Sequence, residues 1–157
     1  MILDFVAEGF QQGWKHIDAS RLAADQSLEA DVVIIGSGAG GGNSAVILAQ
    51  SGLNVIIVEE GPLQTSRDFH MKENEAYSNL YQESAGRQTK DRGIKIFQGR
   101  MVGGGTGINW TTSFRTPAET LKYWAEEMGV LGFSEDEMRP WFEWSEKRYN
   151  IQDWKVP

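Results

Sequence analysis

Three glycines and one carboxylate have the types and spacing needed to bind a dinucleotide. Gly36, Gly38 and Gly41 follow the pattern Gly-x-Gly-x-x-Gly, and Glu59 follows further along the chain. Gly36 permits a sharp backbone turn, Gly38 lets the backbone approach a pyrophosphate, and Gly41 lets a helix pack closely on a strand. The Glu59 carboxylate can accept hydrogen bonds from both hydroxyls of an adenosine ribose, and its charge disfavours the 2′-phosphate of NADP.

The segments around these residues follow the order of a βαβ unit. Residues 31–35 form an apolar run that predicts a buried parallel strand, and residues 45–50 predict a helix. A second apolar run at residues 55–58 leads directly into Glu59. Strand, glycine turn, helix, strand and acid within about 30 residues are typical of a dinucleotide-binding α/β unit. A glycine-rich turn without a ligand remains the alternative.

A second glycine cluster lies between residues 99 and 107, where five of the nine residues are glycine. Such a stretch does not favour a regular element, because ordering glycines is entropically costly. It suits a backbone that passes close to a flat or phosphorylated ligand, where successive N–H groups can bind an anion. A flexible surface loop is the alternative interpretation.

The two clusters together resemble the glucose–methanol–choline (GMC) family of flavin oxidoreductases. That family has a strand ending in Glu, a small residue and Gly, to which Glu-Glu-Gly-Pro at residues 59–62 corresponds, with Glu60 at the position of the small residue. It also has Gly-(Arg/Lys)-x-(Val/Leu)-Gly-Gly-(Ser/Gly)-(Ser/Thr)-x-x-Asn, which matches residues 99–109. The resemblance covers about residues 30–150, and residues 109–117 look most like the long-chain alcohol oxidase and related bacterial branch. It implies a Rossmann-like α/β FAD-binding domain, here truncated.

The resemblance implies FAD as the cofactor, with the adenosine ribose on Glu59 and the pyrophosphate on the first glycine cluster. Covalent-flavin members use a His in the second cluster, and since none is present we expect non-covalent FAD. The better-known members have Ser-Ser after the double glycine and Gly after the Asn, where this chain has Gly105-Thr106 and Trp110. The implied cofactor-binding residues are Gly36, Gly38, Ala39, Gly40, Gly41, Glu59, Glu60, Arg100, Gly103, Gly104, Thr106, Asn109 and Trp110.

The family's catalytic His pair (or His and Asn) lies near the far C-terminus, so we expect no catalytic residue in this chain. We expect residues 30–157 to be the N-terminal part of the FAD-binding domain, preceded by a helical extension at residues 1–29. The full-length parent would oxidise a CH–OH group to a carbonyl with hydride transfer to flavin, and the fragment alone would be inactive. The alternatives are a non-catalytic dinucleotide-binding module or subunit, and an NAD-dependent Rossmann enzyme.

Composition limits the partners. A formal charge of −7 disfavours nucleic acid and anionic membranes as the main partner. The chain has no cysteine and only two histidines, His16 and His70, so we expect no metal site and place both histidines on the surface. No apolar run is long enough to span a bilayer and no secretory signal is present, which indicates a cytoplasmic protein. A small-molecule alcohol is the expected substrate.

Other patterns predict the remaining elements. Apolar spacing favours helices within residues 5–17 and 71–81, and residues 87–98 favour a hairpin whose second strand covers residues 94–97. Capping boxes at residues 116–119 and 134–137 predict two further helices, the first ending at Gly129. Pro140 predicts a kink or the start of a new helix.

Overall fold

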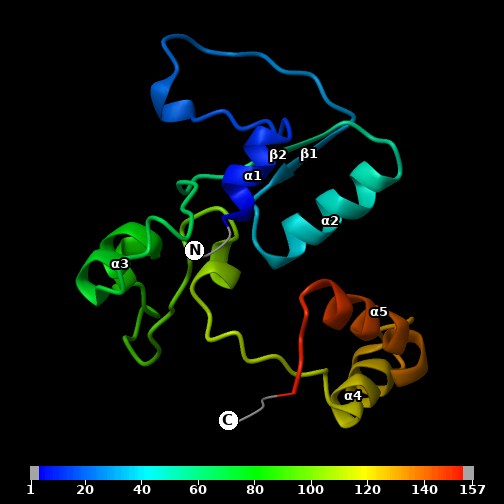
Figure 1. The fold of residues 1–157 in the computed structure, drawn as a ribbon. Helices are drawn as coiled ribbons and strands as arrows, with labels where there is room; N and C mark the ends of the chain where they lie inside the picture. Colours follow the sequence, from blue (N-terminus) through cyan, green and yellow to red (C-terminus); the bar gives the residue numbers. More distant parts are fainter. Residues whose placement is uncertain (1–3, 154–157) are drawn as a thin grey trace. The chain divides into compact units, whose positions relative to one another are not determined.

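The computed structural model describes residues 4–153. The described residues form two compact units, divided between Trp110 and Thr111. The first contains the strands and the glycine clusters, and the second contains two helices (Figure 1). The boundary expected at residue 29 stays a prediction.

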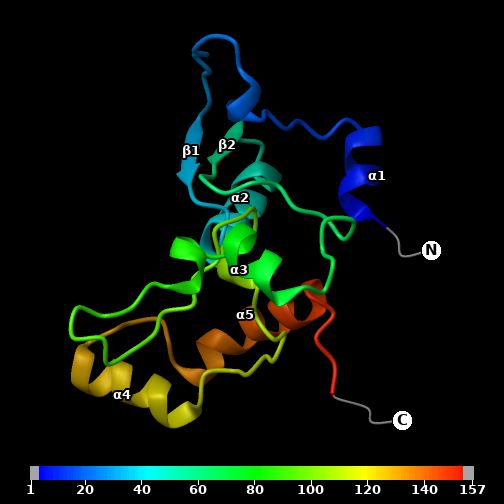
Figure 2. The ribbon, with the colours of Figure 1, turned by 90° about the vertical axis from the view of Figure 1, so that its left-hand side faces the viewer.

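The first unit is built on a parallel βαβ unit. Strands β1 (Val32–Ile35) and β2 (Val55–Val58) pair in parallel, with Val32 opposite Val55 and Ile35 opposite Val58. Helix α2 (Ala39–Gln50) connects the strands and contacts both of them. Figure 2 shows β1 and β2 side by side. The predicted strands, their order and their parallel pairing are confirmed. The expected burial of the first strand is wrong, because residues of β1 alternate between half-buried and exposed, with no further strand or helix covering the exposed face in the described residues.

Helix α2 begins six residues before the start that the apolar pattern suggested. Its N-cap is Gly38, which has no side chain to cap the helix, and its first turn contains Gly40, Gly41 and Gly42. Glycine costs about 1 kcal/mol per residue in a helix interior relative to alanine. Propensity therefore argues against a helix here, and packing against the strands has to stabilise it.

The N-terminal helix α1 (Phe5–Gln11) is shorter than predicted. Asp4 caps it by accepting a hydrogen bond from the backbone N–H of Ala7 at 3.1 Å. The helix cannot continue to Ile17 because Gly13 adopts a left-handed conformation with φ of 95°. Trp14 folds back over the helix, since a Cβ at Gly9 would lie 2.2 Å from its ring.

The predicted hairpin at residues 87–98 forms only in part. Gln88 and Lys95 make an isolated antiparallel bridge, and the N–H of Thr89 donates to the carbonyl of Ile94 at 3.0 Å. The strand expected at residues 94–97 is wrong, because the described chain has no regular strand there. Two short segments without a third strand or a covering helix are only marginally stable as a two-stranded antiparallel sheet. Upstream, helix α3 (Glu73–Leu80) confirms the helix expected near residues 71–81.

The second unit pairs α4 (Ala118–Met128) with α5 (Glu135–Arg148). The capping box at Ser134 is confirmed: Glu137 and Ser134 exchange both hydrogen bonds. The capping box at residues 116–119 is wrong, because Pro117 is the N-cap and has no side-chain acceptor. Gly129 ends α4 in a left-handed conformation, as predicted.

Pro140 lies inside α5, and no new helix begins there. Proline removes one backbone donor, here the one that would pair with the carbonyl of Asp136. The capping box and the remaining hydrogen bonds maintain the helix around that missing donor. Near the C-terminal end of α5, the Glu146 carboxylate accepts two hydrogen bonds from Arg115, at 2.6 and 2.7 Å.

Few side chains are fully buried. Among residues 4–153 the buried apolar residues are Ala45, Met101 and Leu121, while Ile35 on β1 is 90% exposed. The strands of this part of the chain pair only with each other. Helices with the length and apolar character of a membrane span do not occur within the described residues.

Candidate functional site

The first glycine cluster forms a tight turn between β1 and α2. Gly36 has φ of 90°, and its N–H donates to the carbonyl of Val58 on β2 at 2.8 Å. A Cβ on Gly41 would lie 2.0 Å from the Gly36 carbonyl oxygen. By contrast, a Cβ on Gly38 or Gly40 would meet nothing within 4 Å. Gly36 and Gly41 are therefore required by the fold, whereas Gly38 and Gly40 leave open space beside the backbone.

Glu59 lies at the end of β2 and contacts this turn directly. Its Oε2 accepts hydrogen bonds from the N–H of Ser37 at 2.9 Å and from the Ser37 hydroxyl at 2.7 Å. Its Oε1 accepts a bond from the N–H of Gly61 at 2.9 Å. A carboxylate can accept about four bonds, so the acceptor capacity that remains lies mainly on Oε1.

These hydrogen bonds set the charge state of Glu59. Partial burial of the carboxyl by itself would raise its pKa, but the bonds from Ser37 and Gly61 outweigh burial and hold the pKa below its ordinary value. The carboxylate is therefore ionised at neutral pH. Its negative charge faces the start of the glycine turn, where it would repel a phosphate on an adjacent ribose.

The lowered pKa of Glu59 predicts a loss of stability in acid. Because the folded pKa is depressed, the stabilisation is complete above the unfolded value of 4.5 and is lost as the pH falls through the folded pKa. Thermal unfolding measured across that range should show a steeper loss for the wild-type protein than for Glu59→Gln. The exposed Glu29→Gln serves as the matched control and should follow the wild type. Equal slopes for Glu59→Gln and wild type would contradict the prediction.

The second glycine cluster lies directly against the first. The N–H of Gly103 donates to the Ser37 hydroxyl at 3.0 Å, and a Cβ on Gly104 would lie 3.1 Å from the Cα of Gly38. Gly103 and Gly104 both have positive φ, at 100° and 54°. A regular element was not expected here, yet residues Gly104–Gly107 form one short 3-10 turn. The structure thus brings the two clusters together.

The segment at residues 59–62 joins the same assembly. A Cβ on Gly61 would lie 2.3 Å from the backbone nitrogen of Met101, and the N–H of Val102 donates to the Pro62 carbonyl at 3.0 Å. Glu60 pairs with Arg100 across 3.6 Å and also accepts a hydrogen bond from Gln82. Arg100 is therefore held beside the end of β2, although half of its side chain is exposed.

The other predicted residues lie around this assembly. The Thr106 hydroxyl donates to the Gly103 carbonyl at 2.5 Å and closes the second turn. Ala39 and Gly40 are exposed at the start of α2. Asn109 is exposed after the turn, and the Trp110 side chain is 92% exposed. Ser37 was not predicted, although its place between two motif glycines could have indicated a hydroxyl at the centre of the turn.

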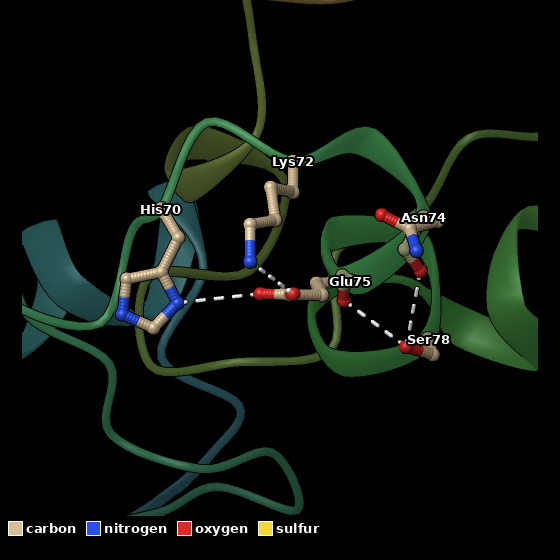
Figure 3. A network of polar contacts seen from close by, with 5 residues as sticks. All are labelled: His70, Lys72, Asn74, Glu75 and Ser78. Atoms are coloured by element: carbon tan, nitrogen blue, oxygen red, sulfur yellow. Dashed lines mark hydrogen bonds and ion pairs between the residues drawn. The ribbon is translucent and has the colours of Figure 1, made fainter.

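Both histidines are exposed, as predicted. His70 Nδ1 lies 3.3 Å from Glu75 Oε2, and the Lys72 ammonium lies 3.0 Å from Glu75 Oε1 (Figure 3). This network is local to the start of α3. His16 packs against the ring of Phe10, with centroids 5.9 Å apart. The contacts of His16 and His70 do not involve the glycine clusters.

Comparison with known families gives two matches, which together cover most of the chain. Residues 31–71 match the model of an FAD binding domain. Residues 77–157 match the model of GMC oxidoreductases. The first match contains the turn and Glu59, and the second contains the other glycine cluster.

Individual relatives agree with these matches. A long-chain-alcohol oxidase of Arabidopsis thaliana (FAO1) is 34% identical over 112 residues, which are 71% of this chain and 15% of the relative. A GMC-type oxidoreductase of Sinorhizobium fredii is 36% identical over 132 residues, 82% of this chain and 26% of the relative. The chain therefore spans about a sixth to a quarter of the length of these curated relatives. The crystal structure of pyridoxine 4-oxidase from Mesorbium loti superposes with a TM-score of 0.54 at 24% identity, over 73% of this chain and 24% of that one.

Proposed function

The chain belongs to the GMC oxidoreductase family with FAD as its cofactor, and on that premise we propose that it binds the ADP half of FAD in an enzyme that oxidises an alcohol to a carbonyl compound. The observation that carries the proposal is the direct contact between the two glycine clusters, through Ser37 and Gly103. One cluster alone is common in nucleotide-binding folds. Two in contact, with an ionised carboxylate beside them, support a ligand that is long and phosphorylated.

The residues divide the proposed binding among them. Glu59 accepts a hydrogen bond from the adenosine ribose at Oε1, where acceptor capacity remains. The open space beside Gly38 and Gly40 admits the pyrophosphate to the N-terminal end of α2, where the first N–H groups of a helix have no partner within the helix and favour an anion. Gly103 and Gly104 continue this lining toward the flavin. The second cluster contains no histidine, so binding is non-covalent.

The flavin, when bound, accepts hydride from the alcohol carbon. The substrate class follows from relatives such as the long-chain-alcohol oxidase, and a small-molecule alcohol is proposed here without a chain length. The absence of a catalytic residue from this chain stays a prediction, and the two histidines are exposed and have local partners. The cytoplasmic location stays a prediction.

The test uses the full-length gene product, purified and examined by absorbance. The expected result is a flavin spectrum, release of the flavin as intact FAD on acid denaturation, and bleaching of the bound flavin when a primary alcohol is added without oxygen. Bound NAD in place of flavin would overturn the assignment of FAD as the cofactor. Flavin that stays attached after denaturation would overturn non-covalent binding. A full flavin complement that no alcohol reduces would favour a binding module without chemistry.

A further inference from the structure

We propose that Ser37 is a positioning residue that orders Glu59 and the second glycine cluster together, before FAD binds. This inference rests on the proposed FAD site and adds to it a residue outside the glycine pattern. The hydroxyl of Ser37 donates to Glu59 Oε2 at 2.7 Å and accepts from the N–H of Gly103 at 3.0 Å. One small side chain thus connects β2, the first turn and the second cluster.

The chemistry of a hydroxyl suits this position. It has one donor hydrogen and two acceptor lone pairs, so it can bond a carboxylate and an N–H at once. Bonds to a charged group are stronger than neutral ones, and this bond orients the carboxylate as well as stabilising its charge. An alanine here would keep the backbone N–H bond to Glu59 but leave the Gly103 N–H without its acceptor.

The second cluster has particular need of such a bond. Gly103 and Gly104 both have positive φ, a conformation that glycine samples among many others when unbound. Ordering them during FAD binding would subtract their conformational entropy from the affinity. A hydrogen bond that orders them beforehand avoids this loss.

A role in the helix itself does not account for Ser37. The N-cap of α2 is Gly38, and the helix has no side-chain cap bond. The Ser37 hydroxyl therefore bonds across the fold, and its removal should weaken ligand binding more than helix stability. Ser51, at the other end of α2, bonds the carbonyl of Ile47 within the helix at 2.9 Å and provides a matched control.

The experiment measures FAD affinity by flavin fluorescence on full-length protein stripped of its cofactor, with thermal unfolding recorded for each variant. We expect Ser37→Ala to weaken FAD binding about tenfold or more. Ser37→Thr, which keeps the hydroxyl, should stay within about threefold of wild type, and Ser51→Ala should match wild type. The loss from Ser37→Ala should shrink markedly in a Glu59→Gln background, because the two residues act as a unit.

Three results would overturn the inference: near wild-type affinity for Ser37→Ala, equal losses for the alanine and threonine variants, or fully additive losses with Glu59→Gln. Failure of the wild-type protein to bind FAD would instead overturn the proposed function. The two failures are therefore distinguishable in the same titration.

Discussion

Replacing Gly41 with alanine should abolish FAD binding and destabilise the first unit by about 3 kcal/mol. The added Cβ would lie 2.0 Å from the Gly36 carbonyl oxygen, 3.1 Å from the Gly36 carbonyl carbon and 3.2 Å from the Ile34 side chain. Two of these atoms are backbone and cannot rotate away, so α2 must move off the strand and open the turn. Thermal unfolding and FAD titration of Gly41→Ala measure the two effects.

The matched control is Gly42→Ala, one residue further along α2. A Cβ there would lie 3.7 Å from the Ser37 carbonyl oxygen, which is an ordinary van der Waals contact. Alanine also favours a helix over glycine by up to about 1 kcal/mol, so Gly42→Ala should leave stability unchanged or slightly raised. Equal behaviour of the two variants would show that close packing at Gly41 does not support the site.

Replacing Gly61 with alanine should separate the second glycine cluster from the end of β2. The Cβ would lie 2.3 Å from the backbone nitrogen of Met101 and 2.4 Å from the carbonyl carbon of Arg100. To remove this clash one of the two backbone segments must shift, which should lower the free energy of unfolding by about 1–3 kcal/mol. We expect FAD affinity to fall about a hundredfold, because Gly103 is displaced from Ser37.

Limited proteolysis checks this prediction independently, since the displaced cluster should be cut faster in Gly61→Ala than in wild type. Gly105→Ala provides the control for folding: a Cβ at that position would meet nothing within 4 Å. Its thermal unfolding and proteolysis should match wild type. An unchanged FAD affinity in Gly61→Ala would show that contact between the two segments is not needed for binding.

The order of elements in the first unit could be predicted because hydrophobic runs of four or five residues lie on either side of a recognisable glycine turn. The first and last residues of the helices were harder to predict. Helix α2 includes three glycines in its first turn, and α1 ends at Gln11 although apolar residues continue to Ile17. In both cases packing or a single left-handed glycine outweighs the local preference.

Errors elsewhere have similar causes. Residues 94–97 begin with an alternation of apolar and polar residues, but a segment with this pattern forms a stable strand only where neighbouring strands extend the sheet. Thr116 and Glu119 match the capping box by type and spacing, yet the helix starts one residue later and Pro117 takes the cap position. The capping-box pattern does not show whether the helix starts one residue later. The cap itself depends on that residue, because only the side chain at the N-cap position can accept the hydrogen bond.

The sequence by itself determined the βαβ order, the glycine motif with Glu59, and the membership of the GMC family. These features depend on residue types within short continuous segments, and the family follows from two such segments in a fixed order. Only the tertiary structure decided that the two clusters touch, that Gly61 packs on Met101, and that Ser37 bridges Glu59 and Gly103. Those contacts join residues 22 to 66 positions apart in the chain, and which side chains meet across such separations depends on how the backbone packs.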